Sequence, residues 1–287
     1  MTTEQPTAGE AAALIQAVLG LDHPPPLRPI GEGGEHKSWW VADRYVARFA
    51  LDRTASHRQR RELALRDLIR PYTDVPVPHS VGHGEWAPGC GFTVDARLHG
   101  ASGEERTLSS VGETQLAMLL RGLYSIPATR VEAIGVPLGG PIDWERLTAR
   151  AEAARLRLSG TETVSATPLR SPRPIPVVEP VLVHADLKGE HLVVRPDGTL
   201  AGVLDWTDAE LAEPVKDIAG LAISVGAPAA VRIAIEAGHA RETATCGVFL
   251  ARCETLVRLD ERLRGDTDSP LPLLRRQLTR AWAEPVP

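Results

Sequence analysis

The chain has 287 residues, a formal net charge of −5 and three cysteines. This length is enough for one large domain or two lobes around a substantial core. The acidic balance argues against nucleic acid or an anionic membrane as the partner, because both favour a basic face. Cys90, Cys246 and Cys253 lack metal-ligand spacing and indicate reduced thiols, and neither a signal peptide nor a membrane-spanning apolar run is recognisable. We therefore expect a soluble, cytoplasmic protein that is a monomer.

Residues 1–98 carry the pattern of a small antiparallel sheet with one packed helix. Apolar residues at helical spacing predict a leading helix over 9–20, which ends at Gly20, and an amphipathic helix over 54–70, which Pro71 stops. Short β-prone runs between Gly- and Asp-containing turns predict strands at 27–30, 38–41, 44–50, 79–82 and 92–98. We expect these elements to form an N-terminal lobe that ends at residue 98.

From residue 99 onward the pattern is mainly helical. Helices are predicted over 111–126, 143–158 and most of 215–284, with a break at 265–272. Residues 159–176 are predicted to form a loop and 180–184 a strand, and 192–194 and 200–204 are predicted to be a hairpin around Arg195-Pro-Asp-Gly-Thr199. The change of character near residues 98–101 predicts a second, larger and mostly helical lobe over 99–287.

The most informative segment runs from His184 to His191 and continues with Leu204-Asp205-Trp206. Phosphoryl transfer to an alcohol needs a carboxylate that orients the hydroxyl and accepts its proton, and ligands that hold Mg²⁺ against the phosphates. Asp186 stands two residues after His184, as in the His-Arg-Asp signature of protein kinases, and His191 stands five residues later, where that signature has Asn. The hairpin then returns the chain, so we expect Asp205 beside the loop that carries Asp186 and His191.

Each of these residues alone has a simpler explanation. A single Asp in a loop is more often a turn or cap residue. His191 among apolar neighbours would more often pack or lie at the surface, and Asp205 before Trp206 would simply end a strand. Their order, their spacing and the hairpin between them together favour a kinase-like site.

Two segments also resemble a known family. HADLKGEHLVV at 184–194 and GVLDWTDAELAEPVKDIAGL at 202–221 resemble the catalytic loop and metal-binding segment of aminoglycoside phosphotransferases. His191 and the Asp-Trp-Thr-Asp-Ala-Glu run are most similar to macrolide phosphotransferases and 2''-aminoglycoside phosphotransferases. The match is tight over these segments and loose over the rest from residue 28. The resemblance implies an α+β, bilobal, protein-kinase-like fold with a small antiparallel-sheet lobe and a larger helical lobe.

The resemblance also implies roles for individual residues. Asp186 would be the catalytic base, and His191 and Asp205 would hold Mg²⁺ with ATP or GTP as the phosphate donor. Asp217 matches an aspartate that anchors the catalytic loop, and His184 matches a residue that is mostly architectural. Imidazole is a softer ligand than the Asn carbonyl, whereas Mg²⁺ prefers oxygen. His191 would then ligate weakly, act through water or tolerate Mn²⁺.

Backbone groups of the N-terminal lobe are expected to hold the nucleotide. Gly33 and Gly34 lie in a Gly-rich turn between two predicted strands, where backbone N–H groups could cover the triphosphate. Gly-rich hairpins are common, however, and the third glycine of the kinase pattern is absent. The purine would be held in the connector between the lobes by backbone groups of Ala96 and Leu98.

A charged pair is expected behind the phosphates. Arg48 occupies the strand position where a kinase carries its phosphate-contacting Lys, and its guanidinium can bind phosphate with two hydrogen bonds. Glu62, fourteen residues on, is the natural ion-pair partner. The alternatives are an ordinary strand-face arginine and a solvated helix carboxylate.

The short distance from Asp205 to Asp217 predicts a small-molecule acceptor. Eleven residues separate them, which leaves no room for the activation segment with which protein kinases bind a peptide. Asp208 and Glu210 are candidate substrate-binding residues, because with other carboxylates they could form an acidic wall for an aminoglycoside or a basic peptide antibiotic. A solvated acidic face is the competing explanation, and a macrolide would instead need a wide apolar cleft.

The leading hypothesis is an antibiotic O-phosphotransferase that confers resistance by modifying a macrolide, an aminoglycoside or a tuberactinomycin. A metabolic kinase of the same fold, acting on a sugar or another small alcohol, is the near alternative. A catalytically inactive nucleotide-binding module is the alternative from another class, since Arg48 replaces Lys, His191 replaces Asn and the glycine loop is incomplete. A dinucleotide-binding oxidoreductase is excluded, because residues 27–50 lack the strand, GxGxxG and helix order.

Overall fold

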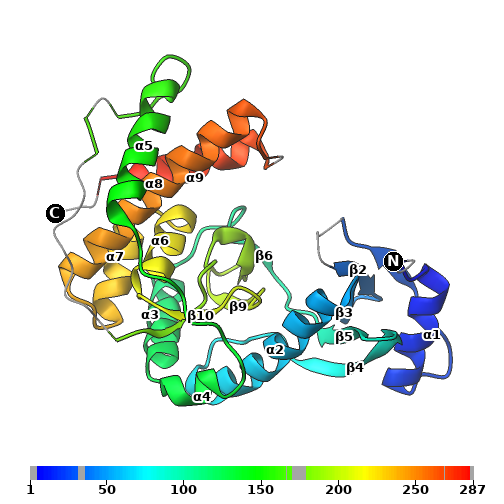
Figure 1. The fold of residues 1–287 in the computed structure, drawn as a ribbon. Helices are drawn as coiled ribbons and strands as arrows, with labels where there is room; N and C mark the ends of the chain where they lie inside the picture. Colours follow the sequence, from blue (N-terminus) through cyan, green and yellow to red (C-terminus); the bar gives the residue numbers. More distant parts are fainter. Residues whose placement is uncertain (1–4, 32–35, 166, 170–178, 268, 285–287) are drawn as a thin grey trace.

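The computed structural model describes residues 5–31, 36–165, 167–169, 179–267 and 269–284 (Figure 1). The small lobe is a five-stranded antiparallel sheet with strand order β1-β2-β3-β5-β4. Its strands are β1 (Leu27–Pro29), β2 (His36–Val41), β3 (Tyr45–Ala50), β4 (Ser80–Ala87) and β5 (Cys90–Ala96). Phe49 stacks on Phe92 with ring centroids 4.8 Å apart and meets Trp39 edge-on, which forms the apolar centre of this lobe.

Two helices flank the sheet, α1 (Ala8–Leu19) and α2 (Arg53–Ile69). Thr7 and Glu10 form a capping box at the start of α1, and the Asp52 carboxylate accepts a hydrogen bond from the Ala55 amide at the start of α2. Helix α1 packs against β4, whereas α2 lies between the sheet and the rest of the molecule (Figure 1). The helix predicted over 54–70 therefore forms a bridge between the two lobes.

Strand β4 is longer than the predicted 79–82. Two of its glycines resemble turn signals in the sequence, but in the structure they lie within the strand, where close packing requires them. A Cβ atom at Gly82 would lie 2.0 Å from Cγ1 of Val18, and one at Gly84 would lie 2.8 Å from Cε1 of Phe92. The glycines thus let α1 and the Phe92 ring approach the strand closely.

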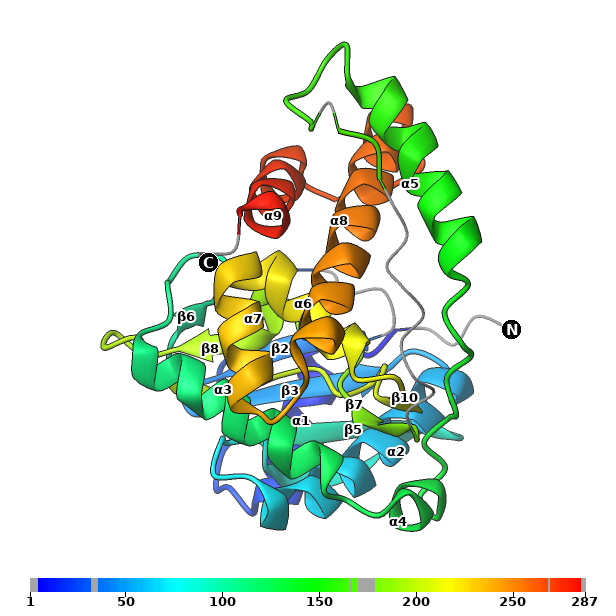
Figure 2. The same cartoon turned by 90° about the vertical axis from the view of Figure 1, so that its left-hand side faces the viewer.

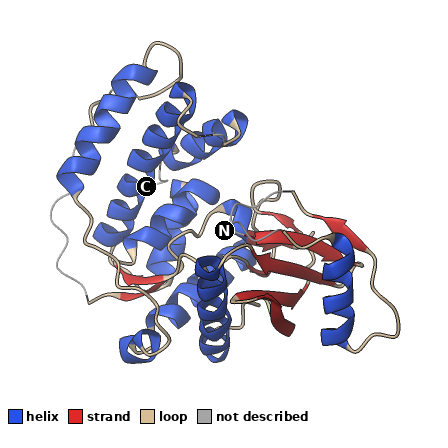
Figure 3. Cartoon of the chain, turned by 45° about the vertical axis from the view of Figure 1, so that its right-hand side comes forward, coloured by secondary structure: helices blue, strands red, loops and turns tan. Residues whose placement is uncertain are grey.

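The large lobe is mostly helical (Figure 3). Its helices are α3 (Ser110–Tyr124), α4 (Ala128–Glu132), α5 (Trp144–Leu158), α6 (Val215–Ser224), α7 (Ala227–Glu236), α8 (Arg241–Arg264) and α9 (Leu271–Trp282). Figure 2 shows α5 alongside α8, with α9 on another side of α8. Two short sheets complete the lobe: β7 (Val181–Val183) with β10 (Glu210–Ala212), and β6 (Ala101–Ser102) with β8 (Leu192–Val194) and β9 (Leu200–Val203). The predicted α+β division into a small sheet lobe and a larger helical lobe is confirmed.

The two lobes share part of one core. Leu65 and Ile69 of α2, with Val75 and Val77, pack into the same buried cluster as α3 and α6. The predicted lobe boundary after residue 98 falls in the connection between β5 and β6. Within the described residues, no helix combines the length and apolarity needed to cross a bilayer.

Candidate active site

The hairpin of β8 and β9 brings the predicted site residues together. A three-residue turn of 3₁₀ helix, Gly189–His191, leads into β8, and β9 ends at Val203, directly before Leu204 and Asp205. The Leu204 amide donates to the His191 carbonyl oxygen at 2.8 Å, which places Asp205 beside His191. Asp186, His191 and Asp205 therefore converge as the sequence predicted.

His191 is oriented by the backbone of Asp186. Its Nδ1–H donates to the Asp186 carbonyl oxygen at 2.7 Å, which assigns the proton to Nδ1 and leaves a lone pair on Nε2. Nε2 lies 3.8 Å from Oδ2 of Asp205. The imidazole and the carboxylate thus present one nitrogen and one oxygen donor to the same space.

The Asp186 carboxylate is paired with a lysine that the sequence reasoning did not single out. The Lys188 ammonium forms an ion pair with it, and Nδ1 of His191 lies 3.5 Å away. Burial alone would raise the pKa of Asp186, but Lys188 and His191 outweigh it and lower the pKa. Asp186 is therefore ionised and able to accept a hydroxyl proton. Lys188 stands two residues after Asp186 in the HADLK run, and this spacing is the sequence signal that could have identified it.

The loop before Asp186 is fixed by Asp217. One oxygen of the buried Asp217 carboxyl accepts from the His184 amide at 3.1 Å and the other from the Ala185 amide at 3.0 Å. These bonds hold Ala185 in a left-handed conformation with φ of 66°. Burial raises the pKa of Asp217 to about 7.

His184 joins this loop to the hairpin. Its Nε2–H donates to the Leu204 carbonyl oxygen at 2.9 Å, and Nδ1 accepts from the Asp186 amide at 3.3 Å. The ring packs on Trp206 with centroids 4.6 Å apart, and burial lowers the pKa of His184 to about 4. A neutral imidazole at this position therefore connects the segments that carry Asp186 and Asp205.

Arg48 and Glu62 form the ion pair expected from the sequence. The guanidinium donates to both carboxylate oxygens, at 3.2 and 2.5 Å. Burial opposes ionisation of Glu62, but Arg48 and Arg66 outweigh it and lower its pKa. The Thr207 hydroxyl donates to Glu62 at 3.3 Å, so the pair is tied directly to the segment that follows Asp205.

A cavity of about 710 Å³ lies between the lobes, and we call it the inter-lobe cavity. Of the predicted site residues it is lined by Arg48, Ala96, Leu98, His191, Asp205 and Asp208. The Ala96 amide donates to the His79 carbonyl oxygen at 2.8 Å, so Ala96 can offer a ligand only its carbonyl oxygen. The predicted glycines Gly33 and Gly34 lie outside the described residues.

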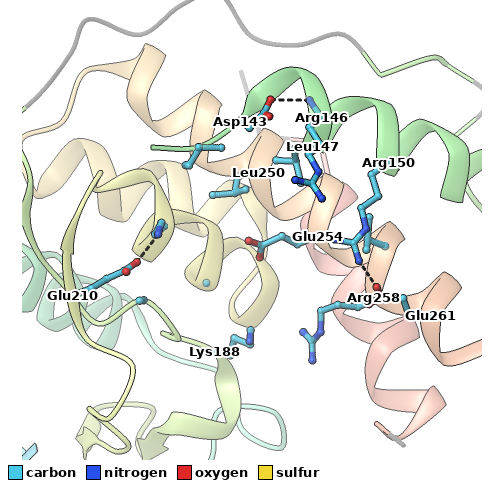
Figure 4. A pocket seen from close by; sticks show the side chains of 15 residues that line it. Asp143, Arg146, Leu147, Arg150, Lys188, Glu210, Leu250, Glu254, Arg258 and Glu261 are labelled. Carbon is cyan, nitrogen blue, oxygen red and sulfur yellow. Dashed lines mark hydrogen bonds and ion pairs between the residues drawn. The ribbon is translucent and has the colours of Figure 1, made fainter. Parts of the chain in front are cut away.

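A second cavity, of about 600 Å³, lies among the helices of the large lobe beside the catalytic loop, and we call it the helical cavity (Figure 4). Ala185, Lys188, Glu210 and Glu254 line it. Asp186 lies between Ala185 and Lys188 in the chain, and His191, whose Nδ1–H donates to the Asp186 carbonyl oxygen, lines the inter-lobe cavity. The catalytic loop therefore contributes residues to both cavities, an arrangement that suits a donor in one and an acceptor in the other.

The two candidate substrate-binding carboxylates do not lie on a single surface. Asp208 lines the inter-lobe cavity and Glu210 the helical cavity. Glu210 forms an ion pair with Lys216, and Glu261 forms one with Arg150. The carboxylates can be read from the sequence. The cations that neutralise them come from other turns or helices, so the sequence alone could not show that they lie beside these carboxylates.

The side chains of His191 and Asp205 fit a metal ion that is also bound by the phosphate groups of a ligand. Among the described residues, no group of three or more His, Cys, Asp or Glu side chains could hold a metal alone. His191 and Asp205 supply two donors, and Mg²⁺ in phosphate-transfer sites takes one or two protein ligands and completes its shell with phosphate oxygens and water.

The fold and this site define a protein-kinase-like phosphotransferase. The sequence profile of the phosphotransferase enzyme family matches residues 26–249, and the chain belongs to that family. Over 202 residues it is 27% identical to the viomycin phosphotransferase of Streptomyces vinaceus. This alignment covers 65% of this chain and 69% of the relative.

Two solved structures show the same fold. The GDP complex of aminoglycoside 2'-phosphotransferase-IIIa superposes with a TM-score of 0.69 at 17% identity, covering 96% of this chain and 98% of that chain. Macrolide 2'-phosphotransferase type I superposes with a TM-score of 0.61 at 15% identity, covering 97% and 98%. The kinase-like fold and the antibiotic-phosphotransferase resemblance predicted from the sequence are therefore confirmed.

Proposed function

We propose that this enzyme transfers the γ-phosphoryl group of ATP or GTP to a hydroxyl group of a small-molecule antibiotic. The observation that carries the proposal is that the loop of the ionised Asp186 contributes to both cavities: Ala185 and Lys188 line the helical cavity, and His191 lines the inter-lobe cavity. The relatives named for viomycin, aminoglycosides and macrolides support an antibiotic as the acceptor.

Each residue has a role in this proposal. Asp186 orients the acceptor hydroxyl and takes its proton as the bond to phosphorus forms. His191 through Nε2 and Asp205 through a carboxylate oxygen would hold Mg²⁺, which when bound neutralises charge on the phosphates. Arg48, fixed by Glu62, faces the inter-lobe cavity and would contact the triphosphate. Asp217 and His184 position the loop.

The intact Arg48–Glu62 pair and the ionised Asp186 favour an enzyme over an inactive nucleotide-binding module. Incubation with ATP or with GTP and a panel of macrolides, aminoglycosides and tuberactinomycins tests the proposal, with mass spectrometry as the readout. We expect one class to gain a single phosphoryl group. If the protein neither binds nor hydrolyses either nucleotide, the proposed function is wrong.

A further inference from the structure

A second buried ion pair lies beside the pair of Arg48 and Glu62. The Arg66 guanidinium of α2 donates to both oxygens of the Asp95 carboxylate of β5, at 3.2 and 3.4 Å. Arg66 is 1% exposed and Asp95 is 4% exposed, and the Thr93 hydroxyl also donates to Asp95 at 3.4 Å. Such a pair contributes little net stability, because both charges lose their hydration, so stability alone does not account for it.

Arg66 also stands next to Glu62. The two residues are four apart on α2, so their side chains lie on the same face of the helix, and Nε of Arg66 is 3.9 Å from Oε1 of Glu62. This Nε is buried and has no hydrogen-bond partner within the part of the chain that the structure describes. Oε1 is the oxygen that accepts from Nη1 of Arg48 at 3.2 Å. Two arginines therefore face one carboxylate oxygen, and in the structure Arg48 is hydrogen-bonded to it.

Asp95 lies in the same layer as Arg48. Strand β5 pairs with β3, and Asp95 is opposite Val46, two residues before Arg48. Alternate residues of a strand share one face of the sheet, as do residues directly opposite each other on neighbouring strands. Asp95 and Arg48 therefore point to the same side, and both line the inter-lobe cavity. The carboxylate that pairs with Arg66 is thus part of the site to which Arg48 belongs.

We propose that Asp95 and Arg66 are positioning residues for the triphosphate. Asp95 holds Arg66 away from Glu62. The Glu62 carboxylate is thereby left to fix Arg48. Without the Asp95 charge, Arg66 becomes a buried cation that has lost its carboxylate, and Glu62 lies within reach of it. A guanidinium that moves onto Oε1 of Glu62 displaces Nη1 of Arg48 and leaves Arg48 less well fixed. This inference rests on the proposed function, which assigns Arg48 to the phosphates.

Asp95→Asn removes the charge of this carboxylate and keeps its shape. The Kd of the nucleotide that the unaltered protein binds, ATP or GTP, is expected to rise about tenfold, which lies within the coupling found between residues of one network. The Kd of the matching nucleoside should stay within about twofold, because a nucleoside has no phosphates for Arg48 to contact. Equal losses for nucleotide and nucleoside would mean that Asp95 contacts the base, and the proposal would be wrong.

Removal of Arg66 as well should restore nucleotide binding. In Asp95→Asn/Arg66→Met the competing cation is gone, so the nucleotide Kd should return to within about threefold of the unaltered value. Loss of both charges of a buried pair is also tolerated better than loss of one. A double variant that binds nucleotide as weakly as Asp95→Asn would overturn the proposal. Asp67→Asn is the matched control with an unchanged Kd, because Asp67 pairs with Arg70 on α2 but is exposed and does not line the inter-lobe cavity.

Unfolding in urea tests the exchange of arginines at Glu62 without nucleotide. When Arg48→Met is made in the Asp95→Asn background, Arg66 is free to compensate Glu62, so the substitution should destabilise the fold less than it does in the unaltered background. A double-mutant cycle measures this difference. Additive losses would overturn the inference even if the enzyme phosphorylates antibiotics. Non-additive losses in a protein that binds neither ATP nor GTP would support the exchange at Glu62 and contradict the proposed function.

Discussion

The Nδ1–H of His191 donates to the backbone carbonyl oxygen of Asp186 at 2.7 Å, so the residue proposed to hold the metal is oriented by the residue proposed as the base. The remaining lone pair on Nε2 faces Asp205. The imidazole direction is therefore set by the catalytic loop and needs no metal to establish it. This arrangement gives the proposed histidine ligand a geometric basis.

His191→Asn is expected to change the metal preference of the enzyme. An Asn carbonyl is a harder ligand than imidazole and suits Mg²⁺ better, whereas imidazole accepts Mn²⁺ readily. The ratio of activity with Mn²⁺ to activity with Mg²⁺ should therefore be higher in the unaltered protein than in His191→Asn. Steady-state rates across a titration of each metal measure it, with His191→Ala as the variant that has no ligand. Equal ratios in the unaltered and Asn forms would mean that His191 does not contact the metal.

Arg48→Met is expected to weaken both nucleotide binding and folding. It removes the cation facing the inter-lobe cavity and leaves Glu62 buried without its bidentate partner, a type of loss that costs about 3–5 kcal/mol. The nucleotide Kd should rise at least about tenfold, equivalent to ~1.4 kcal/mol. Arg48→Lys keeps the charge and should lie between the two. An unchanged nucleotide Kd in Arg48→Met would make Arg48 a structural strand residue.

The stability difference between the unaltered protein and Asp217→Asn is expected to depend on pH. Burial raises the pKa of Asp217 from 3.8 to about 7, so between these values the folded chain binds more protons than the unfolded chain. The stability that this carboxyl contributes is thus fully present below pH 3.8 and is lost as the pH rises toward 7. The advantage over Asp217→Asn should shrink over that range, by ~1.4 kcal/mol per pH unit. Urea unfolding measures it, and a constant difference would contradict the raised pKa.

Gly220→Ala is expected to disturb the catalytic loop from behind. A Cβ atom there would lie 2.8 Å from the Leu187 carbonyl oxygen, directly after Asp186, and backbone cannot move aside as a side chain can. Overpacking of this kind costs about 1–3 kcal/mol, and kcat should fall because the loop carries Asp186. Gly160→Ala is the control, since nothing lies within 4 Å of a Cβ at that position. A normal kcat in Gly220→Ala would show that the loop tolerates displacement.

Most of the fold could be predicted because the long elements have clear periodicity and caps. Gly20, Pro71 and the hairpin turn after Val194 each mark an element boundary within a few residues of its position in the structure. Strands β6 and β10 and helix α4 were missed, because two to five residues are too few for a periodic signal. Tertiary pairing defines such short elements.

The candidate site was predictable only where its residues are close in sequence. Asp186, His191 and Asp205 lie within one loop and hairpin, so their meeting follows from local structure. The residues that line the helical cavity are not close in sequence. Arg258, for example, lies on a distant helix, where it donates to Gln277, which donates in turn to Glu190. The sequence left an acidic wall and a solvated acidic face both open, because charge counts along the chain cannot show which carboxylates are already paired.

Mass spectrometry of Asp186→Asn beside the unaltered protein tests the central claim most directly. Each is incubated with nucleotide and the antibiotic panel, and nucleotide binding is measured separately. The unaltered protein should add one phosphoryl group to an acceptor, and Asp186→Asn should do so about 10²- to 10⁴-fold more slowly while it still binds nucleotide. Phosphorylation at an undiminished rate by Asp186→Asn would contradict the assignment of the catalytic base and the account of the site that rests on it.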